Sequence, residues 1–381
     1  MKFILAPDSF KGSLSSKEVG LALEEGIRRV FLDAEVVKIP MADGGEGTVE
    51  AFLMANGGQV EQCTALDPLG VRRKSFFGIL GDGKTAVIEM AAVSGLPLVP
   101  FEKRNPALTT TFGTGELILN ALDAGCRKII LGLGGSATND GGVGCLQALG
   151  VQFLDIYGEE LPFGGIHLEK LVTINSENLD HRLQETEILI ACDVSNPLCG
   201  EYGAARIYGP QKGATLEMVV RLDAGLAHYA GIIQAHLGID IRNIPGAGAA
   251  GGFGAGLIAF LRTKLRSGAD LVSEFSGLEK QIAGSDVVIT GEGKIDGQTA
   301  SGKAPLAVAN LAKKYHKTCF GVAGMLDGSL AGLYPEGFSA FFSIAKGPVS
   351  LDEAIKNAYS LIVDSTEQVM RIFQAGGSLN S

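Results

Sequence analysis

The distribution of hydrophobic residues predicts alternating strands and helices at the start of the chain. A short apolar run over 2–6 is followed by a polar loop and then by hydrophobic residues at helical spacing over 19–31. Ser15 and Glu18 have the spacing of a capping box that would begin this helix. A second strand over 35–39, another loop and another helix follow. This order is typical of a parallel sheet covered by helices.

The pattern changes between residues 59 and 90, where hydrophobic and polar positions alternate. Turn sequences over 67–70 and 81–83 interrupt this stretch, which predicts an antiparallel meander. A helix over 115–124 and a strand over 128–133 then restore the earlier pattern. A change of topology of this kind often marks a domain boundary.

The remaining strands and helices are expected at regular intervals. The predicted strands are 187–191, 286–290, 318–323 and 338–344. Two predicted helices end at residues 149 and 265, and two more cover 305–315 and 351–373. We therefore expect an α/β protein with two domains, since 381 residues are many for one core. Residues 1–60 plus 285–381 would form a discontinuous Rossmann-like parallel-sheet domain. Residues 61–284 would form an inserted α/β domain with a mixed sheet, and the active site would lie in the cleft between them.

Composition limits the classes of partner. Hydrophobic residues make up 46% of the chain and charged residues 19%, which indicates a well-buried core. A net charge of -10 disfavours nucleic acid and anionic membranes as partners, although a small anionic substrate needs only a local cationic site. Six scattered cysteines, a short apolar N-terminal run and no long apolar stretch indicate a cytoplasmic protein. Homo-oligomerisation is left open.

Ligands of open parallel sheets bind beyond the carboxyl ends of the strands, so polar residues there are candidates. The first group follows the first strand and contains Asp8 and Lys11, where a helix N-terminus could bind an anion. A solvated loop with serine caps is an equal alternative. The third group contains Asp193 after the strand at 187–191. Its alternative is an aspartate that begins a turn before Asn196 and Pro197.

The second group is a glycine-rich turn after the strand at 128–133. Successive amides there could bind a phosphate, hydroxyls could donate to it, and a carboxylate could hold Mg²⁺. The alternative is a tight strand-to-helix turn in which the Asp and Asn side chains act as caps. The residues concerned are Gly134, Gly135, Ser136, Thr138, Asn139 and Asp140.

The fourth group lies in what reads as a loop after the strand at 286–290. Carboxylates and lysines alternate with glycine there, which suits a Mg²⁺–nucleotide complex better than a charged surface loop. The charged residues are Glu292, Lys294, Asp296 and Lys303.

Two glycine motifs are discounted. Gly246, Gly248 and Gly251 match GxGxxG, but in a chain with 54 glycines the match is weak, and no clear strand precedes it. We interpret this segment as flexible or closely packed backbone. The GxxxxGK match over 297–303 lacks the hydroxyl residue that follows the lysine in a P-loop. Neither HExxH nor GxSxG occurs, so carboxylates, lysines, hydroxyls and amides remain, an inventory that fits phosphoryl transfer.

Eight blocks of the sequence together resemble the type I glycerate kinase family, in the family's order and over nearly the whole chain. The resemblance implies a two-domain α/β fold and ATP-dependent phosphorylation of D-glycerate, to 2-phosphoglycerate or alternatively to 3-phosphoglycerate. The blocks are APDSFKGS (6–13), ADGGEGT (42–48), TFGTGELI (111–118), GLGGSATNDGG (132–142), DVSNPLCG (193–200), GPQKG (209–213), GAGAAGGFGAG (246–256) and TGEGKIDGQTASG (290–302).

Roles for the candidate residues follow as hypotheses. Mg²⁺ would be held by Glu292 and Asp296. Lys11 would neutralise the phosphoryl group or the glycerate carboxylate, and Asp193, or failing it Asp8, would accept the hydroxyl proton. The ATP triphosphate would bind at Gly134, Gly135, Ser136, Thr138, Asn139, Lys294 and Lys303.

Two other classes of protein remain as alternatives. A nicotinamide-dependent hydroxyacid dehydrogenase would use the 246–256 segment. A non-catalytic sugar-acid binding protein would use a two-lobed architecture, although such proteins are usually exported.

Overall fold

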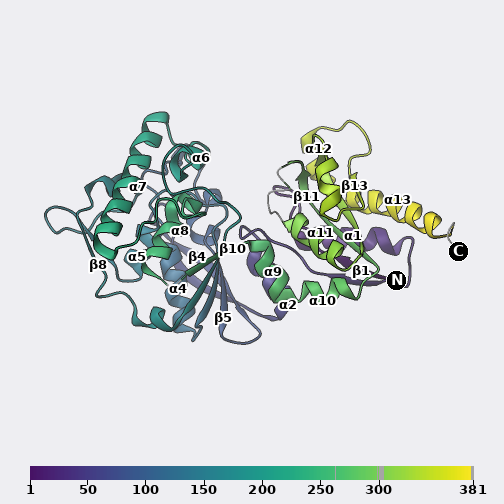
Figure 1. Ribbon diagram of the computed structural model, residues 1–381, viewed down its shortest axis with the longest axis horizontal. Coiled ribbons are helices and arrows are strands. Elements are labelled where there is room, and N and C mark those ends of the chain that lie inside the picture. Colours follow the sequence, from purple (N-terminus) through teal and green to yellow (C-terminus); the bar gives the residue numbers. More distant parts are fainter. Residues whose placement is uncertain (262, 298, 300–303, 379–381) are drawn as a thin grey trace. The chain divides into compact units, whose positions relative to one another are not determined.

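The protein is described by a computed structural model over residues 1–261, 263–297, 299 and 304–378 (Figure 1). Its contacts divide the chain into two compact units, each made of segments that are not contiguous in sequence. Unit 1 comprises Met1–Asp43, Glu50–Asn56 and Ala269–Ser381, and unit 2 comprises Gly44–Val49 and Gly57–Gly268. Residues 269–284 thus pack with unit 1, whereas the sequence-based boundary would leave them in the inserted domain.

Unit 1 contains a five-stranded sheet in which all the strands are parallel, as expected for a sheet formed by both chain ends. Its order is β13-β12-β11-β1-β2. The strands are β1 (Lys2–Leu5), β2 (Glu35–Lys38), β11 (Val287–Ile295), β12 (Thr318–Leu326) and β13 (Ala340–Ser343).

The strand order of unit 1 reverses between β1 and β11. From β1 the chain moves to β2 on one side, and from β11 it moves to β12 and β13 on the other. Such a reversal is a topological switch point, where loops leave the carboxyl ends of neighbouring strands in opposite directions. This position therefore has the geometry that α/β proteins use for ligands.

The helices of unit 1 cover both faces of its sheet. Phe3 and Leu5 of β1 belong to a core with residues of the first and last helices, whereas Ile4 is fully buried on the opposite face. The predicted capping box of Ser15 and Glu18 is present. The helices are α1 (Ser16–Arg28), α9 (Gly268–Ser276), α10 (Leu278–Ala283), α11 (Ala304–Lys314), α12 (Leu351–Lys356) and α13 (Ala358–Ser378).

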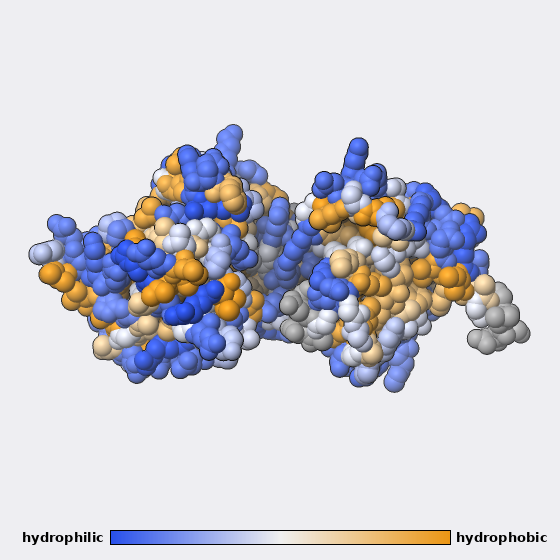
Figure 2. Space-filling model, turned by 90° about the horizontal axis from the view of Figure 1, so that it is seen from above, coloured by the Kyte–Doolittle hydropathy of each residue, from blue (hydrophilic) through white to orange (hydrophobic). Residues whose placement is uncertain are grey.

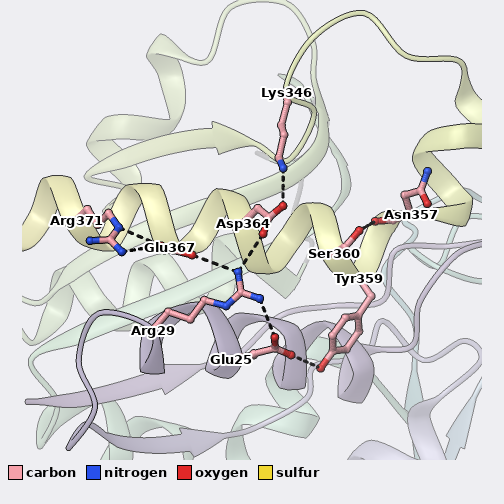
Figure 3. Close-up of polar contacts among 9 residues, drawn as sticks. All are labelled: Glu25, Arg29, Lys346, Asn357, Tyr359, Ser360, Asp364, Glu367 and Arg371. Atoms are coloured by element: carbon pink, nitrogen blue, oxygen red, sulfur yellow. Dashed lines mark hydrogen bonds and ion pairs between the residues drawn. The ribbon is translucent and has the colours of Figure 1, made fainter.

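An ion-pair network joins α1 to α13 on the surface of unit 1 (Figure 3). The Arg29 guanidinium donates to Glu25 of α1 at 3.0 Å. It also donates to Asp364 and Glu367 of α13, at 3.0 and 3.2 Å. Arg371 also pairs with Glu367, one turn away. The network supplements the buried contacts between the two helices rather than replacing them.

Unit 2 contains a mixed six-stranded sheet in the order β10-β9-β6-β5-β4-β3. Its first four strands are mutually parallel, and β5, β4 and β3 form the antiparallel meander that the alternating pattern predicts. The strands are β3 (Gly58–Leu66), β4 (Arg72–Leu80), β5 (Thr85–Glu89), β6 (Lys128–Gly132), β9 (Glu187–Ala191) and β10 (Thr263–Arg266), with a separate hairpin of β7 (Gln152–Leu154) and β8 (Thr173–Asn175).

The helices of unit 2 pack around two hydrophobic cores. The helix α8 is interrupted by left-handed backbone at Ala250, Gly251 and Gly252. The helices are α3 (Ala91–Ser94), α4 (Phe112–Asp123), α5 (Val143–Ala148), α6 (Ala204–Tyr208), α7 (Leu216–Leu237) and α8 (Ala249–Phe260), and α2 (Thr48–Asn56) begins in unit 2 and ends in unit 1.

Three sequence-based expectations about elements are wrong. The helix expected to end at 265 stops at Phe260, because residues 263–266 pair with β9 as a strand. The single helix expected over 351–373 is broken at Asn357 into α12 and α13. The strand expected over 286–290 continues to Ile295, because β12 pairs with it throughout.

The surface carries both kinds of residue. Hydrophilic residues are interspersed with hydrophobic ones on the face shown in Figure 2, as is usual for folded proteins. Within the described residues, every helix is too short or too polar to cross a lipid bilayer.

Candidate active site

The switch point of unit 1 gathers four charged side chains. Asp8 follows β1, and its N–H donates to the Gly291 carbonyl of β11 at 2.8 Å. The Lys11 ammonium lies 2.5 Å from the Asp43 carboxylate, which follows β2. The charges of Asp43, Lys11 and Glu292 all act on the Asp8 carboxyl group. The first and fourth predicted groups thus lie together in one unit, and sequence reasoning missed Asp43 although it also follows a strand.

Asp8 is the most perturbed carboxyl group of this cluster. Its side chain is buried, and burial together with the Asp43 charge raises its pKa from 3.8 to about 7, against the opposing effects of the Ser9 N–H and Lys11. A carboxyl group with a pKa of about 7 is roughly half ionised at neutral pH. It can therefore both accept and release a proton, which is what a general base requires.

Glu292 and Lys294 lie on β11 itself rather than in a loop after it, which corrects the sequence-based reading, whereas Asp296 follows the last residue of the strand. Glu292 and Lys294 are two residues apart on the strand, so their side chains share one face. The Lys294 ammonium lies 3.1 Å from Asp296 and 2.8 Å from Asp327. Lys294 is thus held by two carboxylates and would have to exchange one of them for a phosphate. Lys303 lies outside the described residues.

Glu292 and Asp296 are compatible with a bound divalent cation. The Thr299 hydroxyl donates to Glu292 at 2.9 Å and accepts the Asp296 N–H at 3.2 Å, so both residues approach one side chain. Oxygen ligands suit Mg²⁺, which commonly takes one or two carboxylates and completes its shell with phosphate and water. No cluster of three or more His, Cys, Asp or Glu residues suited to a metal occurs in the described ranges.

The second and third predicted groups lie together in unit 2. The glycine-rich turn follows β6 and Asp193 follows β9, and these strands are neighbours whose last residues, Gly132 and Ala191, are paired. Gly44 lies against both strand ends, since a Cβ there would be 2.7 Å from the Ala191 carbonyl oxygen. Gly44 of the ADGGEGT block thus packs against this end of the sheet.

Only part of the glycine-rich turn has amides available for a ligand. The Gly134 N–H donates to the Gly44 carbonyl at 3.0 Å, so this amide is already used. The N–H groups of Gly135 and Ser136 have no acceptor in the part of the chain that the structure describes. Gly135 is exposed and Ser136 is 7% exposed. These two amides are the ones that an anion could reach.

Thr138 and Asn139 lie deeper in the same turn. Both are fully buried, and the Thr138 hydroxyl and the Asn139 amide group have no hydrogen-bond partner among the described residues. Burial keeps both side chains from direct contact with a ligand in this conformation. Their proposed contact with ATP stays a prediction.

Asp140 accepts four hydrogen bonds inside unit 2. One carboxylate oxygen accepts the Thr111 N–H and hydroxyl, both at 2.8 Å, and the Gly144 N–H, while the other accepts the Gly142 N–H. The side chain is 2% exposed. It ties the turn to the start of α4, so the Mg²⁺ role considered for it finds no support.

Lys212 is a buried cation that sequence reasoning did not single out, although GPQKG was among the recognised blocks. It ends a short 3₁₀ helix, Pro210–Lys212, and its ammonium donates to the Ser136 hydroxyl and the Thr138 carbonyl, both at 2.7 Å. Burial lowers its pKa to about 7, although the Asp140 charge opposes the shift. The available signal was a lysine in a short segment with glycine at both ends, and this pattern does not reveal that the side chain is buried.

Asp193 is held at the end of β9. Its carboxylate accepts the Gly268 N–H at 3.0 Å, and the residue is half-buried. The contact fixes the side chain beside the end of β10. The proposed proton transfer stays a prediction.

The 246–256 glycines are needed for close packing. A Cβ at Gly248 would lie 2.2 Å from the Pro197 carbonyl oxygen, and one at Gly251 would lie 2.1 Å from that of Thr138. The segment therefore packs closely against the loops that follow β6 and β9. This confirms the close-packed interpretation of the GxGxxG match.

These features define a class: an α/β protein whose strand ends carry the carboxylates, lysines and unpaired amide donors of an enzyme that acts on small anions. Comparison with known proteins gives the family. The model of the Glycerate kinase family matches residues 3–374, and the chain belongs to this family. It is a kinase, and so a phosphotransferase.

Individual relatives extend over nearly the whole chain. Glycerate 2-kinase of Escherichia coli (strain K12) is 50% identical, with 99% of each chain covered. Glycerate kinase of Haemophilus influenzae is 51% identical, with 98% of each covered. A crystal structure assigned as glycerate kinase 2 of Salmonella typhimurium LT2 is 48% identical and covers 99% of each chain with a TM-score of 0.88.

Proposed function

We propose that the protein transfers the γ-phosphoryl group of ATP to D-glycerate, giving 2-phosphoglycerate. The observation that carries the proposal is the group of Asp8, Lys11, Asp43 and Glu292 at the switch point of the unit 1 sheet. A basic carboxylate, a lysine and further acidic ligands are what phosphoryl transfer to a hydroxyl needs. The names of the relatives support glycerate as the acceptor, and that of the Escherichia coli relative supports the 2-hydroxyl.

Asp8 is the residue that we assign as the base, with Asp193 as the alternative. The glycerate hydroxyl oxygen forms a bond to the γ-phosphorus while the bond from that phosphorus to the bridging oxygen breaks, and ADP leaves. The hydroxyl proton passes to the Asp8 carboxylate, which later releases it to solvent. The raised pKa of Asp8 supports this assignment, since a carboxylate of ordinary pKa is a much weaker base.

Lys11 and the glycine-rich turn are assigned to the anionic groups. The Lys11 side chain is 72% exposed although paired with Asp43, so its ammonium can reach a phosphoryl or carboxylate oxygen. The amides of Gly135 and Ser136 are assigned to the triphosphate, with Lys294 as a further cation. Positioning and neutralisation of charge account for most of the rate in this class of reaction.

Mg²⁺ is assigned to Glu292 and Asp296. The ion neutralises phosphate charge when it is bound with ATP. Glu292→Gln should raise the Mg²⁺ concentration needed for half-maximal activity. Lys280→Gln, an exposed change in α10 of the same unit, should leave it unchanged. An identical Mg²⁺ requirement in Glu292→Gln would remove this residue from the metal site.

The test of the proposed function is ³¹P NMR of a mixture of the protein, ATP, Mg²⁺ and D-glycerate. We expect ADP together with the phosphomonoester resonance of 2-phosphoglycerate, which authentic 2- and 3-phosphoglycerate standards distinguish. Formation of the 3-isomer would change the acceptor hydroxyl but keep the reaction. If no ADP and no new ester appear, the proposal is wrong.

The two candidate bases can be separated by matched substitutions. Asp8→Asn should lower kcat by about 10²–10⁴-fold while leaving the Kd for ATP nearly unchanged. Asp193→Asn should have a clearly smaller effect. The reverse ranking would make Asp193 the base.

A further inference from the structure

A buried lysine lies directly behind the glycine-rich turn of unit 2. Lys212 is 3% exposed, and both acceptors of its ammonium, the Ser136 hydroxyl and the Thr138 carbonyl, are neutral. Buried ammonium groups are usually stabilised by a carboxylate at contact distance. Among the described residues no carboxylate forms an ion pair with Lys212, and the nearby Asp140 accepts hydrogen bonds from four other donors.

This arrangement leaves the proton of the Ser136 hydroxyl available. The hydroxyl oxygen accepts from Lys212 at 2.7 Å, so its own O–H must donate elsewhere. The structure shows no acceptor for that proton in the described part of the chain, and the neighbouring amides of Gly135 and Ser136 also have none. Three donors in one turn, with a positive charge behind them, lack an acceptor. An oxyanion would supply it.

We propose that Lys212 is a positioning residue: it orients the Ser136 hydroxyl to donate to an oxyanion of a substrate and supplies the positive charge behind that hydrogen bond. The inference rests on the proposed function. Phosphate oxygens of ATP are the oxyanion that we assign, and the carboxylate of glycerate has the same chemistry. The Kd values for the two ligands distinguish them.

The pH dependence of binding has a defined sign. Lys212 must be charged, and the charged groups near it are Asp140, which follows the same turn, and Arg104, whose carbonyl oxygen lies against Gly213 and whose guanidinium stacks on Phe101. With a pKa of about 7, the ammonium loses its proton as the pH rises above neutrality. Binding of the oxyanion should therefore weaken between pH 7.5 and 9, by up to about tenfold per pH unit.

The experiment measures Kd by calorimetry for ATP with Mg²⁺ and, separately, for D-glycerate. Lys212→Met retains an unbranched side chain, shortens it by the terminal ammonium and removes its charge. It should raise the Kd of ATP by about 10- to 100-fold and abolish the weakening above pH 7.5. Lys264→Met, an exposed lysine of the same unit, is the matched control and should behave as the wild type.

A double-mutant cycle separates this role from a purely structural one. If Lys212 acts through the Ser136 hydroxyl, Lys212→Met combined with Ser136→Ala should bind ATP no more weakly than Lys212→Met alone. The proposal would be overturned if the affinity losses of the two single variants multiplied in the double variant. It would also be overturned if Lys212→Met lowered the melting temperature but left the Kd and its pH dependence unchanged. Should Lys212→Met fail to fold, Ser136→Ala still tests it, because unchanged ATP and glycerate Kd values would remove the hydroxyl from binding.

The outcome is distinguishable from failure of the proposed function. If the wild-type protein forms no phosphoglycerate, the proposed reaction is wrong whatever the variants do. If it does and Lys212→Met retains wild-type Kd values for both ligands, only the role of Lys212 is wrong. A loss confined to D-glycerate would place its carboxylate, rather than the phosphate of ATP, at Ser136.

Discussion

At the scale of single residues, Asp8 combines a cost in stability with a use in catalysis. Its pKa in the folded protein is about 7, against 3.8 for an ordinary aspartate. Between these two pH values the folded chain retains a proton that the unfolded chain has lost, so the free energy of unfolding falls as the pH rises through this range. Above pH 7 the whole penalty is present. A buried carboxylate near other carboxylates lowers the free energy of unfolding, and the protein retains one at the switch point, where we assign it a catalytic role.

Asp8→Asn should therefore be more stable and less active than the wild type. At pH 8 we expect its free energy of unfolding to exceed that of the wild type by on the order of 2–4 kcal/mol, and at pH 4 the difference should largely disappear. The wild-type kcat/KM should rise with pH through about 7, and the variant should lack this limb. Urea denaturation and steady-state kinetics at several pH values measure both. Equal stability at pH 8 would contradict the assigned pKa.

Neighbouring residues in the α8 kink should differ strongly in their sensitivity to substitution. Gly251→Ala would place a Cβ 2.1 Å from the Thr138 carbonyl oxygen, in left-handed backbone, and should cost about 3 kcal/mol or more. Ala250→Gly, which adopts a similar φ of 52°, should change stability by less than about 1 kcal/mol. Thermal unfolding compares them. If Gly251→Ala left the melting temperature unchanged, close packing of this segment against the glycine-rich turn would not be needed for stability.

Single residues also show how far the sequence could predict the site. Asp8 and Lys11 could be found because they directly follow a recognisable strand, and Asp43 satisfies the same rule. Lys212 could not, because its importance depends on burial against a turn 76 residues away. The alternatives for Asp140 could not be separated for a related reason, since two of its donors come from Thr111, 29 residues earlier in the chain.

At the scale of elements, the exposed ion pairs between α1 and α13 should contribute modestly to the stability of the protein. Arg29 contacts three carboxylates and Arg371 one (Figure 3). Arg29→Met should lower the melting temperature more than Arg371→Met does. In 1 M salt the difference should shrink, because exposed ion pairs are screened. Scanning calorimetry at low and high salt measures this, and a salt-independent difference would point to packing of the arginine stem instead.

Elements were predicted well where the signal was local and poorly where pairing decided them. The strand at 187–191 and the capping box of α1 depend on residues close in sequence, and both are confirmed. The continuation of β11 through Gly291–Ile295 depends on pairing with β12, which glycine-rich sequence does not indicate. The strand β10 looked like the end of a helix because its apolar residues continue those of α8. Pairing with β9 overrides that local pattern.

At the scale of the whole molecule, the first and last segments of the chain belong to one fold. β1 and α1 share a core with β11, β12 and α13, so Phe3, Leu23 and Ile27 pack with Ile362 and Met370. The sequence predicted this union because both ends read as alternating strands and helices. It could not place the boundaries, since residues 269–284 are helical and helices suit either unit.

Deletion of α13, leaving residues 1–357, tests this organisation. The deletion removes Ile362, Val363 and Met370 from the unit 1 core and exposes the apolar side chains that they cover. Loss of several buried aliphatic residues, at about 2–5 kcal/mol each, exceeds the stability of most domains. We expect β1 and β11 to lose amide-exchange protection, whereas β6 and β9 keep theirs because their own core is intact.

Full-length protein bearing Ile372→Ser, an exposed position on α13, is the control and should keep both sets protected. Simultaneous loss of protection in all four strands would mean that the two units unfold as a single cooperative body, whereas retained protection of β1 would show that the chain ends do not depend on each other.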